Sequence, residues 1–465
     1  MTPKIFFAHL REMTERFDPR YVAFRRRAAE FRYPMVRLSE LLSALPEYGA
    51  GEAGIERTNI KQPRYIRITD INDDGELSSE LGATAETVEA KYFLSDGDLL
   101  FARSGATVGK CYLHETAKVE YPCFYAGYMI RFRFNVSVLP QYVFAFAQTS
   151  YYHDWAAAIQ RSAGQPNINA QEYCDLQIPL PPPEVQRQIV AELDAAYTAK
   201  RKADEKAAHL LASIDDVVLS ELGISKLPPQ DTSLHARMFT VSAAEVFEHR
   251  MDAVAYQDLR RHFLMNVGHS RYPQVALGEL VNVNRQQTDA LNGRQYVGLE
   301  NIDGATGDFL PTQDKESLSS AVLFKEGEIL FPKLRPYLNK IWLATFDGAA
   351  STEFYPLQSK TEEAAYLTTY LRTKAVADVM TLLMTGNTLP RVQLEDILSL
   401  PVPVPPRSVQ QRITEKVAVI REEAKGLKTA VAAILHAQKE HIEAQILGKC
   451  CGEPIPVADN RSKCV

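Results

Sequence analysis

The sequence lacks the features that a membrane protein, a secreted protein or a metal-binding protein would need. No apolar run approaches the roughly 18 residues required to span a bilayer, and MTPKIFFAHLREMTERF at the N-terminus is charged too early for a secretory signal. Its six cysteines are scattered, without a CxxC pair or a Cys/His cluster at metal-ligand spacing. We therefore expect a cytoplasmic protein with free thiols and no metal site.

Catalytic motifs are equally scarce. The sequence has no HExxH, no GxSxG, no Asn/Asp-Pro-Pro-aromatic motif and no glycine-rich turn placed to bind S-adenosylmethionine. GATVGK (Gly105 to Lys110) has three residues between its glycines where a phosphate-binding loop needs four, and Cys111 replaces the magnesium-binding Ser or Thr. We therefore expect a protein without catalytic activity of its own.

Length and composition indicate a globular protein of more than one domain. The 465 residues are 46% apolar and 24% charged, which suits two or three compact units. The net charge of −6 argues mildly against nucleic acid as a partner. That objection is weak, because a sum over the whole chain averages any DNA-facing surface with the rest.

An internal repeat is the most informative feature of the chain. IPLPPPEVQRQI (Ile178 to Ile189) recurs as VPVPPRSVQQRI (Val402 to Ile413), at an offset of 224 residues. Further blocks recur upstream in the same order: RFD (16–18) and RMD (250–252), RYPMVRLSEL (32–41) and RYPQVALGEL (271–280), YIRITDI (65–71) and YVGLENI (296–302), GDLLFAR (97–103) and GEILFPK (327–333), PNINAQEY (166–173) and PRVQLEDI (390–397). The order indicates duplication of a whole structural unit, with divergent loops between the shared blocks.

A long helix is predicted after each Pro-rich block, because proline is accepted in the first turn of a helix. From Pro183 to Leu222 the helix would be about 60 Å long at about 1.5 Å per residue. Apolar residues recur at heptad spacing in both helices: Ile189, Leu193, Ala196, Ala203, Ala207, Leu210, Ile214 and Val217 in the first, and Ile413, Val417, Ile420, Ala424, Leu427, Val431 and Ile434 in the second. The helices have opposite net charge, which favours pairing them with each other over packing each on its own domain.

The repeated blocks closely resemble the specificity subunit of type I restriction-modification enzymes. The resemblance rests on GDLLFARSGATVGK (97–110), GEILFPKLRPYLNK (327–340), GQPNINAQEY (164–173) and PLPPPEVQRQIV (179–190), and it extends from about Arg16 to Lys449. It implies an α+β fold with two tandem target-recognition domains of like fold, each followed by a long helix. The two helices would pair as an antiparallel coiled coil, giving a pseudo-twofold arrangement.

The resemblance also implies a domain organisation and a set of partners. We expect target-recognition domain 1 at 1–180, a central helix at 181–224, a linker at 225–240, target-recognition domain 2 at 241–402, a C-terminal helix at 403–449 and a tail at 450–465. Each recognition domain would read one half of a split, asymmetric site in double-stranded DNA, and the helices would set the spacer. Two modification (methyltransferase) subunits would bind S-adenosylmethionine, and a restriction (motor-nuclease) subunit would use ATP and Mg; this chain itself would hold no cofactor.

Candidate DNA-binding residues lie after the GDLLF and GEILF strands and around the PNINAQEY and PRVQLEDI blocks. Their guanidinium, ammonium, hydroxyl and amide groups suit phosphates or base edges. The candidates are Arg103, Ser104, Thr107, Lys110, Arg161, Asn167, Lys333, Arg335, Tyr337, Asn339, Lys340 and Arg391. Because the loops after the GDLLF and GEILF strands are shared by copies that should read different sequences, a structural turn or a phosphate contact is an open alternative there. We expect base readers in the divergent loops instead, with these candidates: Arg57, Asn59, Lys61, Arg161, Asn167, Arg285, Gln286, Gln287 and Arg391.

The heptad seams supply the candidate helix-pairing interface, which comprises Ile189, Leu193, Leu210, Ile214, Ile413, Val417, Leu427 and Val431. Two other functions stay open at this point. One is a DNA-recognition subunit of a related methyltransferase-nuclease or phage-defence system. The other is a coiled-coil scaffold whose globular domains bind protein, which would leave the preserved frame and divergent loops unexplained.

Overall fold

The computed structural model describes residues 31–77, 81–105, 107–119, 121–160, 166–226, 238, 240–242, 258–311, 320–386 and 389–447. Arg161, most of the expected linker and the tail from 450 lie outside the described residues. The chain divides into two compact units, one of residues 1–201 with 431–465 and one of residues 202–430. Within the described part, no helix is both long and apolar enough to cross a membrane.

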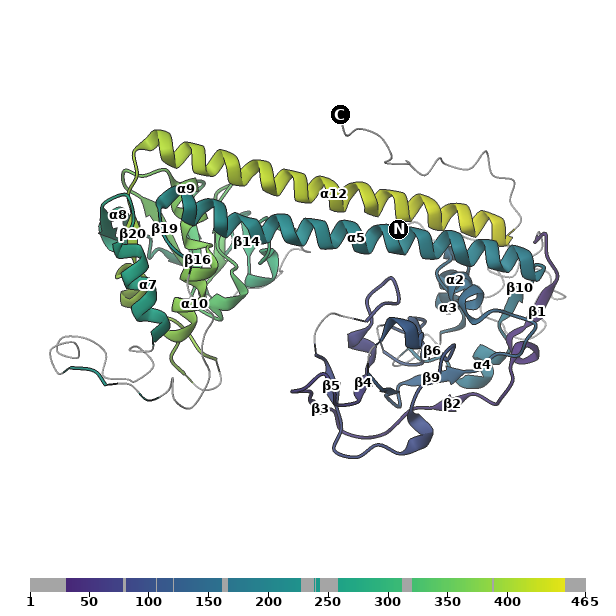
Figure 1. Cartoon of the computed structure of the whole chain (residues 1–465). Helices are drawn as coiled ribbons and strands as arrows, with labels where there is room; N and C mark the ends of the chain where they lie inside the picture. Colours follow the sequence, from purple (N-terminus) through teal and green to yellow (C-terminus); the bar gives the residue numbers. More distant parts are fainter. Residues whose placement is uncertain are drawn as a thin grey trace. The chain divides into compact units, whose positions relative to one another are not determined.

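The described residues of the first unit form two four-stranded sheets and three short helices, together with the long helix (Figure 1). One sheet has the order β2 (Glu47–Tyr48), β9 (Met129–Phe132), β6 (Leu99–Ala102), β7 (Cys111–Leu113), and the other β3 (Ile55–Glu56), β5 (Ala83–Thr84), β4 (Arg64–Ile66), β8 (Cys123–Tyr125). The helices are α2 (Pro140–Phe146), α3 (Ser150–Ile159) and α4 (Ala170–Cys174). A short pair, β1 (Met35–Arg37) with β10 (Gln177–Pro179), then leads into the long helix α5 (Pro183–Leu222).

The second unit repeats this plan. Its sheets have the orders β12 (Val281–Val283), β19 (Phe354–Ser359), β16 (Ile329–Pro332), β17 (Trp342–Leu343) and β13 (Gln287–Thr288), β15 (Ala321–Phe324), β18 (Gly348–Ser351), β14 (Gln295–Val297). Helices α9 (Ala364–Leu371), α10 (Lys374–Leu382) and α11 (Leu394–Leu398) correspond to α2, α3 and α4, while α7 (Asp258–Gly268) and α8 (Leu277–Leu280) precede them. The pair β11 (Gln274–Ala276) with β20 (Pro401–Pro403) precedes the long helix α12 (Arg407–Leu447). The predicted α+β fold of two like domains, each followed by a long helix, is confirmed.

The shared sequence blocks form the central strands. β6 and β16 are the LLFA and ILFP runs of the repeat, and all eight of their residues are buried. A continuous apolar run bounded by turns is typical of a strand buried on both faces. Each of these strands lies between two neighbours in its sheet, which explains why the repeat preserves them best.

One buried glutamine fixes the start of each long helix at the same offset of the repeat. Gln186 Oε1 accepts a hydrogen bond from Leu139 N (2.9 Å), and its Nε2 donates to Pro181 O (3.0 Å). Gln410 makes the same two bonds, with Glu363 N (3.0 Å) and Pro405 O (2.9 Å). Both glutamine side chains are 1% exposed, so water cannot reach their amide groups, and these bonds supply the hydrogen-bond partners that the amides need.

The two units differ in their second sheets. In the second unit β15 pairs with β18 over four residues, including Leu323 with Ala349. At the equivalent place in the first unit only a single bridge joins Phe93 to Phe124, and β5 pairs with β4 instead. The duplicated frame therefore persists in the sheet that contains β6 or β16 and diverges in the other sheet of each unit.

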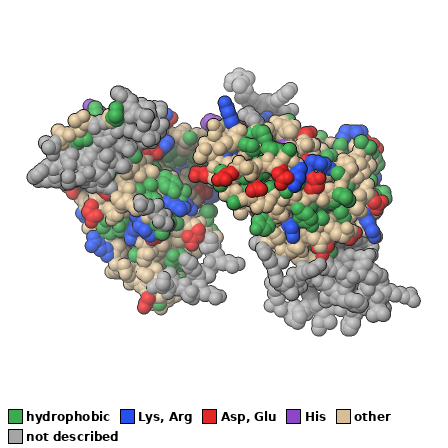
Figure 2. Space-filling view, turned by 90° about the horizontal axis from the view of Figure 1, so that it is seen from below, with side chains coloured by type: hydrophobic (Ala, Val, Ile, Leu, Met, Phe, Trp, Pro, Cys, Tyr) green, Lys and Arg blue, Asp and Glu red, His purple; other side chains and the backbone are tan. Residues whose placement is uncertain are grey.

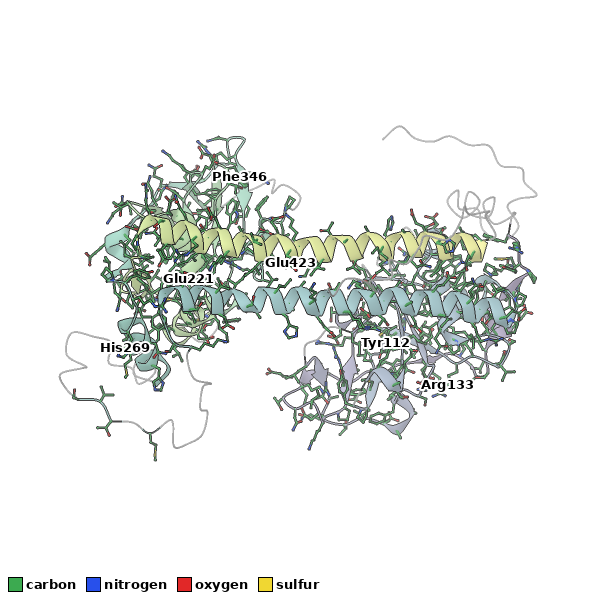
Figure 3. The ribbon with its side chains drawn as sticks, turned by 45° about the horizontal axis from the view of Figure 1, so that its top comes forward. Tyr112, Arg133, Glu221, His269, Phe346 and Glu423 are labelled. Atoms are coloured by element: carbon green, nitrogen blue, oxygen red, sulfur yellow. The ribbon has the colours of Figure 1, made fainter. Side chains whose placement is uncertain are left out.

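The long helices pair antiparallel within each unit. In the first unit Glu192, near the start of α5, accepts hydrogen bonds from Gln438 (3.1 Å) and Gln445 (3.2 Å), near the end of α12. In the second unit Glu221, at the end of α5, pairs with Arg412 and Lys416 near the start of α12 (2.9 and 2.5 Å). Figure 3 shows α5 and α12 side by side in the second unit, where Glu221 of α5 and Glu423 of α12 are labelled. The predicted antiparallel pairing is confirmed.

One position of the predicted heptad seam is wrong. Ile434 is 58% exposed, whereas its neighbour Leu435 is 5% exposed and packs in the core of the first unit with Ile442 and Ile446. After Leu427 and Val431 the buried stripe takes a second consecutive step of four residues. Since a straight helix has 3.6 residues per turn, a strict 3.5-residue repeat drifts off the buried face, and the extra step corrects the drift.

Candidate nucleic-acid interface

The first unit joins the end of β6 to the segment before α4 by backbone hydrogen bonds. Ile168 N donates to Arg103 O (2.8 Å), Gly105 N donates to Pro166 O (3.1 Å), and Ser104 bridges Asn167. We call these two segments, 103–105 and 166–168, the loop joint of the first unit. It brings together candidates that lie more than sixty residues apart in the sequence, Arg103 and Ser104 with Asn167.

Two side chains of this joint carry unsatisfied polar atoms. The Arg103 guanidinium lies over the Tyr48 ring, 4.8 Å from its centroid. Within the described part of the chain, Arg103 Nε and Asn167 Oδ1 are buried without a hydrogen-bond partner. Buried polar groups are almost always paired. Two unpaired polar atoms beside an accessible loop are therefore consistent with a site that binds a polar ligand.

Lys110 and Thr107 follow the joint, and the lysine is engaged within the protein. Its Nζ lies 2.7 Å from Asp73 Oδ1 and 3.3 Å from Ile71 O. The ion pair lowers the pKa of the Asp73 carboxyl. Thr107 is half-buried. Lys110 therefore secures the turn after Ile71, and a DNA contact would have to compete with these bonds.

The second unit has the same joint with different side chains. Val392 N donates to Lys333 O (2.9 Å), Arg335 N lies 3.5 Å from Pro390 O, and Leu334 bridges Arg391. These segments, 333–335 and 390–392, are the loop joint of the second unit. The backbone frame is thus shared, while Arg103, Ser104 and Asn167 become Lys333, Leu334 and Arg391.

The turn after this joint has an unusual backbone. Arg335 (φ 50°) and Asn339 (φ 51°) are left-handed at the positions where the first unit has Gly105 and Gly109, both with φ 91°. Glycine enters this region without cost, whereas a side chain makes it strained. Arg335 is exposed, and its side chain has no partner among the described residues. The structure holds this guanidinium outward at some cost in backbone energy.

The other basic candidates of the second unit have partners. Arg391 forms two hydrogen bonds with the Glu353 carboxylate (2.9 and 2.7 Å), which lower the pKa of Glu353. Lys333 Nζ donates to Thr352 O (2.5 Å) and lies 4.3 Å from the Tyr355 ring centroid, and burial lowers its pKa. Lys340 Nζ donates to Leu299 O (2.8 Å), which parallels Lys110.

Sequence reasoning missed three residues beside the joints. Tyr48 is 41% exposed, and Tyr128 is 66% exposed in the turn between β8 and β9, where its carbonyl accepts a hydrogen bond from Arg103 N (2.9 Å). Glu353 occupies the corresponding position of the second unit and accepts from Lys333 N through its carbonyl (2.7 Å). No motif marks these turns, because only strand pairing brings them to the joints.

Arg57 is a structural residue and not an accessible base reader. It is 2% exposed, its Nε donates to Gln62 O (2.9 Å), its Nη1 donates to Leu81 O (3.0 Å), and its guanidinium lies 4.0 Å from the Tyr121 ring centroid. Arg285, Gln286 and Gln287 are exposed and remain candidates. On the face drawn in Figure 2, the described Lys and Arg side chains lie among Asp and Glu side chains.

The candidate helix-pairing residues lie in or beside the cores of their units. Ile189 and Leu193 belong to the core of the first unit, together with Leu435 of α12. Ile413 and Val417 belong to the core of the second unit, against which Ile214 packs. The remaining candidates differ in solvent exposure: Val431 is buried, and Leu210 and Leu427 are half-buried.

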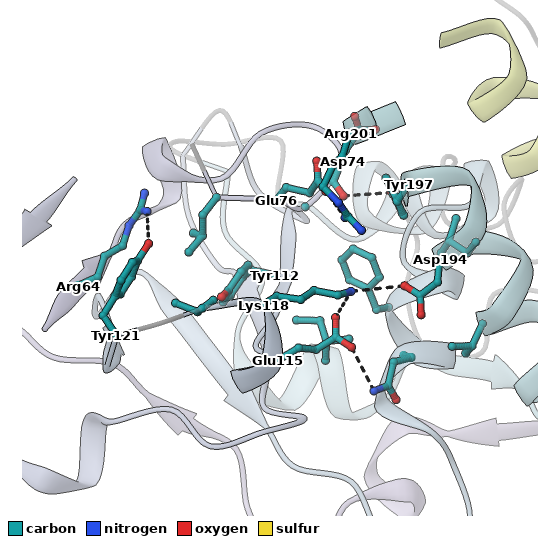
Figure 4. Close-up of a pocket in the computed structure, with 18 residues that line it drawn as sticks. Arg64, Asp74, Glu76, Tyr112, Glu115, Lys118, Tyr121, Asp194, Tyr197 and Arg201 are labelled. Carbon is teal, nitrogen blue, oxygen red and sulfur yellow. Dashed lines mark hydrogen bonds and ion pairs between the residues drawn. The ribbon is translucent and has the colours of Figure 1, made fainter. Parts of the chain in front are cut away.

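Each unit also has a cavity between its domain and its long helix, at repeat-equivalent positions. The cavity of the first unit, about 540 Å³, is lined by Leu113, Phe144, Val190, Leu193 and Tyr197 among others, and that of the second, about 300 Å³, by Leu343, Thr368, Thr414, Val417 and Arg421 at the corresponding places. In the first cavity Lys118 is paired with Glu115 and Asp194, and Tyr197 donates to Asp74 O (Figure 4). These bonds tie the domain to α5.

Parts of the chain are similar in sequence to known proteins. Residues 52–206 match the model of the type I restriction modification DNA specificity domain. The EcoDI specificity subunit of the type I restriction enzyme from Escherichia coli is 32% identical over 126 residues, which are 27% of this chain and 28% of that protein. The match thus spans less than a third of the relative's length.

Solved structures of similar chains cover more of the sequence. The HsdS subunit from Thermoanaerobacter tengcongensis is 17% identical, covering 90% of this chain and 97% of that one, with a TM-score of 0.34. The S subunit of a type I restriction-modification system from M. genitalium is 11% identical, covering 91% and 98%, with a TM-score of 0.41.

Residues 52–206, nearly all of them in the first unit, are thus similar to a type I DNA specificity domain. Part of the chain is likewise similar to the specificity subunit of a type I restriction enzyme.

Proposed function

We propose that the whole chain is the DNA sequence-specificity subunit of a type I restriction-modification complex. Each unit reads one half of a bipartite, asymmetric site in double-stranded DNA, and the paired helices α5 and α12 set the spacer. The chain itself is non-catalytic and binds no cofactor. Two modification subunits supply S-adenosylmethionine-dependent methylation, and a restriction subunit supplies the ATP- and Mg-dependent motor and nuclease, all in the cytoplasm.

The repeated loop joint is the observation that carries this proposal. Both units use the same backbone bonds to hold two distant segments together, yet they present different side chains there. A shared backbone frame with different side chains suits two domains that both bind DNA but recognise different base sequences. Arginine, asparagine and threonine side chains are suited to phosphates and base edges.

The joints divide the candidate residues into two groups. Among the described residues Arg335 is exposed and has no side-chain partner, and Arg103 and Asn167 carry unsatisfied atoms, so these three are our first candidates for DNA contact. Tyr337 is also exposed, and Ser104, Thr107 and Asn339 are half-buried. Lys110, Lys333, Lys340 and Arg391 already bind within the protein, so we assign them first to holding the loops.

The test is DNA selection by the purified complex. The chain is purified with a type I modification subunit and S-adenosylmethionine, and bound duplexes are selected from a random pool. Asn167→Ala should relax preference in one half of the selected motif and Arg335→Ala should weaken binding or relax the other, with a loss of about 1–3 kcal/mol where a base contact is removed. Lys374→Ala removes an exposed charge of the second unit outside its joint and serves as the control.

The outcomes separate the alternatives. Selection of a two-part motif with effects confined to one half per variant supports the proposal. Failure to form the complex or to select any sequence contradicts it. A related methyltransferase-nuclease system is favoured instead if the chain selects DNA only together with a single fused methyltransferase-nuclease chain.

A further inference from the structure

The turn that follows the loop joint of the second unit exposes apolar side chains. It contains the short helix η9 (Pro336–Leu338), in which Tyr337 is 49% and Leu338 is 39% exposed. Leu389, on the other segment beside the joint, is 46% exposed. Arg335 precedes the helix and is exposed too. Large apolar groups beside an exposed guanidinium on one tight turn are unusual for a surface that meets only water.

This turn is held rigidly. Pro336 is buried, and Leu338 N and Asn339 N donate to Arg335 O and Pro336 O (both 2.9 Å). Asn339 Nδ2 donates to Arg372 O (2.7 Å), and Arg372 Nη1 donates back to Asn339 O (2.7 Å). Left-handed residues at both ends would relax if these bonds were absent. The turn therefore presents Tyr337 and Leu338 in a fixed position.

The first unit keeps the turn without the exposed apolar pair. Gly105 and Gly109 take the two left-handed positions there, so that backbone is unstrained. Thr107 stands where the second unit has Tyr337, and Val108, which stands where it has Leu338, packs against the core. The apolar pair is thus a departure of the second unit alone and is not needed to build the turn.

We propose that Tyr337 and Leu338 form an apolar wedge that inserts at a base step of the half-site bound by the second unit and deforms the duplex there. Arg335 contacts a phosphate beside the opened step. This inference rests on the proposed function and adds a mode of reading, in which the sequence is selected partly by how easily that step unstacks.

Size and charge favour DNA over a protein partner at this place. Three exposed apolar side chains form a small patch, whereas each side of a stable protein interface buries about 800 Å². A rigid pair of apolar side chains matches the wedges with which DNA-bending proteins unstack a base step. The adjacent guanidinium suits a phosphate, and the side chains need no disorder-to-order transition to insert.

A tryptophan reporter tests the insertion. The two native tryptophans, Trp155 and Trp342, are 5% and 3% exposed, so a Tyr337→Trp side chain would dominate the fluorescence that responds to ligand. In complex with the modification subunit and a duplex of the selected motif, stacking on a base should quench this signal. Leu264→Trp, at an exposed position on α7, is the matched control and should stay unchanged.

Deformation is measured on the same duplex with fluorescent labels at its ends. The Tyr337→Ala/Leu338→Ala double variant should lose about tenfold in affinity and return energy transfer to the value of free DNA. Arg335→Ala should weaken binding but retain the change in energy transfer, since the wedge is still present.

The possible results are distinct. Intact DNA binding by the Tyr337→Trp variant without quenching of its fluorescence, or a double variant that deforms DNA as the wild type does, overturns the wedge alone. Quenching by the modification subunit before DNA is added assigns the surface to a protein contact and overturns it as well. Failure of the wild-type complex to bind any duplex overturns both the wedge and the proposed function.

Discussion

Replacing the buried Gln186 by leucine should lower the unfolding free energy of the first unit strongly, because two backbone groups lose their hydrogen-bond partner. Leucine nearly preserves the side-chain volume, so little cavity arises. It does leave Leu139 N–H and Pro181 C=O buried without their partners, which are now 2.9 and 3.0 Å away. At about 1–3 kcal/mol for each unsatisfied group, the expected loss of unfolding free energy is about 2–5 kcal/mol.

The repeat provides a second, independent copy of this experiment. Gln410→Leu removes the equivalent bonds to Glu363 N and Pro405 O, so its cost should fall in the same range. Gln188 and Gln411 are exposed on the same helices, and leucine there should change the unfolding free energy by less than about 0.5 kcal/mol. All four variants replace glutamine by leucine, so differences in their unfolding free energies report whether the glutamine is buried or exposed.

Amide hydrogen exchange is the suitable assay, because two units need not unfold together. Gln186→Leu should accelerate exchange in α2 and the first turns of α5, whereas Gln410→Leu should do so in α9 and the first turns of α12. Urea denaturation supplies the free energies. A loss below about 0.5 kcal/mol for either buried glutamine, or equal acceleration in both units, would refute the assignment of these side chains as anchors.

Three further predictions concern the joint, the helix pair and the strand leading to α12. Arg335→Gly should raise the unfolding free energy by up to about 1 kcal/mol, because glycine relieves the left-handed strain, and it should weaken DNA binding. Denaturation and DNA titration measure the two effects, and a loss of both stability and DNA affinity would contradict the prediction. Hydrogen bonds from Lys416 and Arg412 lower the pKa of Glu221, so its stabilisation exists above the unfolded pKa of about 4.3 and disappears as pH falls through the lower folded value. Glu221→Gln should therefore cost about 0.5–1 kcal/mol at pH 7 and progressively less as the pH falls below the unfolded pKa, and a pH-independent difference in the denaturation curves would argue against the ion pair. Tyr366→Phe, which removes the hydrogen bond to Pro403 O (2.6 Å), should cost about 1 kcal/mol, and an unchanged melting curve would count against that bond.

The frame of this protein could be predicted from sequence because burial constrains it in both copies. Ile189 and Ile413 are fully buried at the same offset, and so are the strands built by LLFA and ILFP. Apolar periodicity and proline placement report such constraints directly. The change of step that buries Leu435 instead of Ile434 was missed, because the sequence offers an apolar residue at both positions.

The candidate site was less predictable, since its residues depend on pairing between distant segments. Arg57 resembles a DNA-binding residue in sequence, yet three backbone carbonyls hold its guanidinium in the interior. Tyr128 and Glu353 carry no motif and reach the joints only through strand pairing. The strained conformation of Arg335 is visible only by alignment with Gly105 of the other copy, where an arginine replaces a residue that favours positive φ.

The central claim is that one chain reads two different half-sites of one DNA. Its most direct test is to map N6-methyladenine in genomic DNA of cells that express this chain with a type I modification subunit and no other specificity subunit. The account predicts a single asymmetric motif in two parts, separated by a spacer of constant length. A continuous or palindromic motif, or methylation that is independent of this chain, would contradict it.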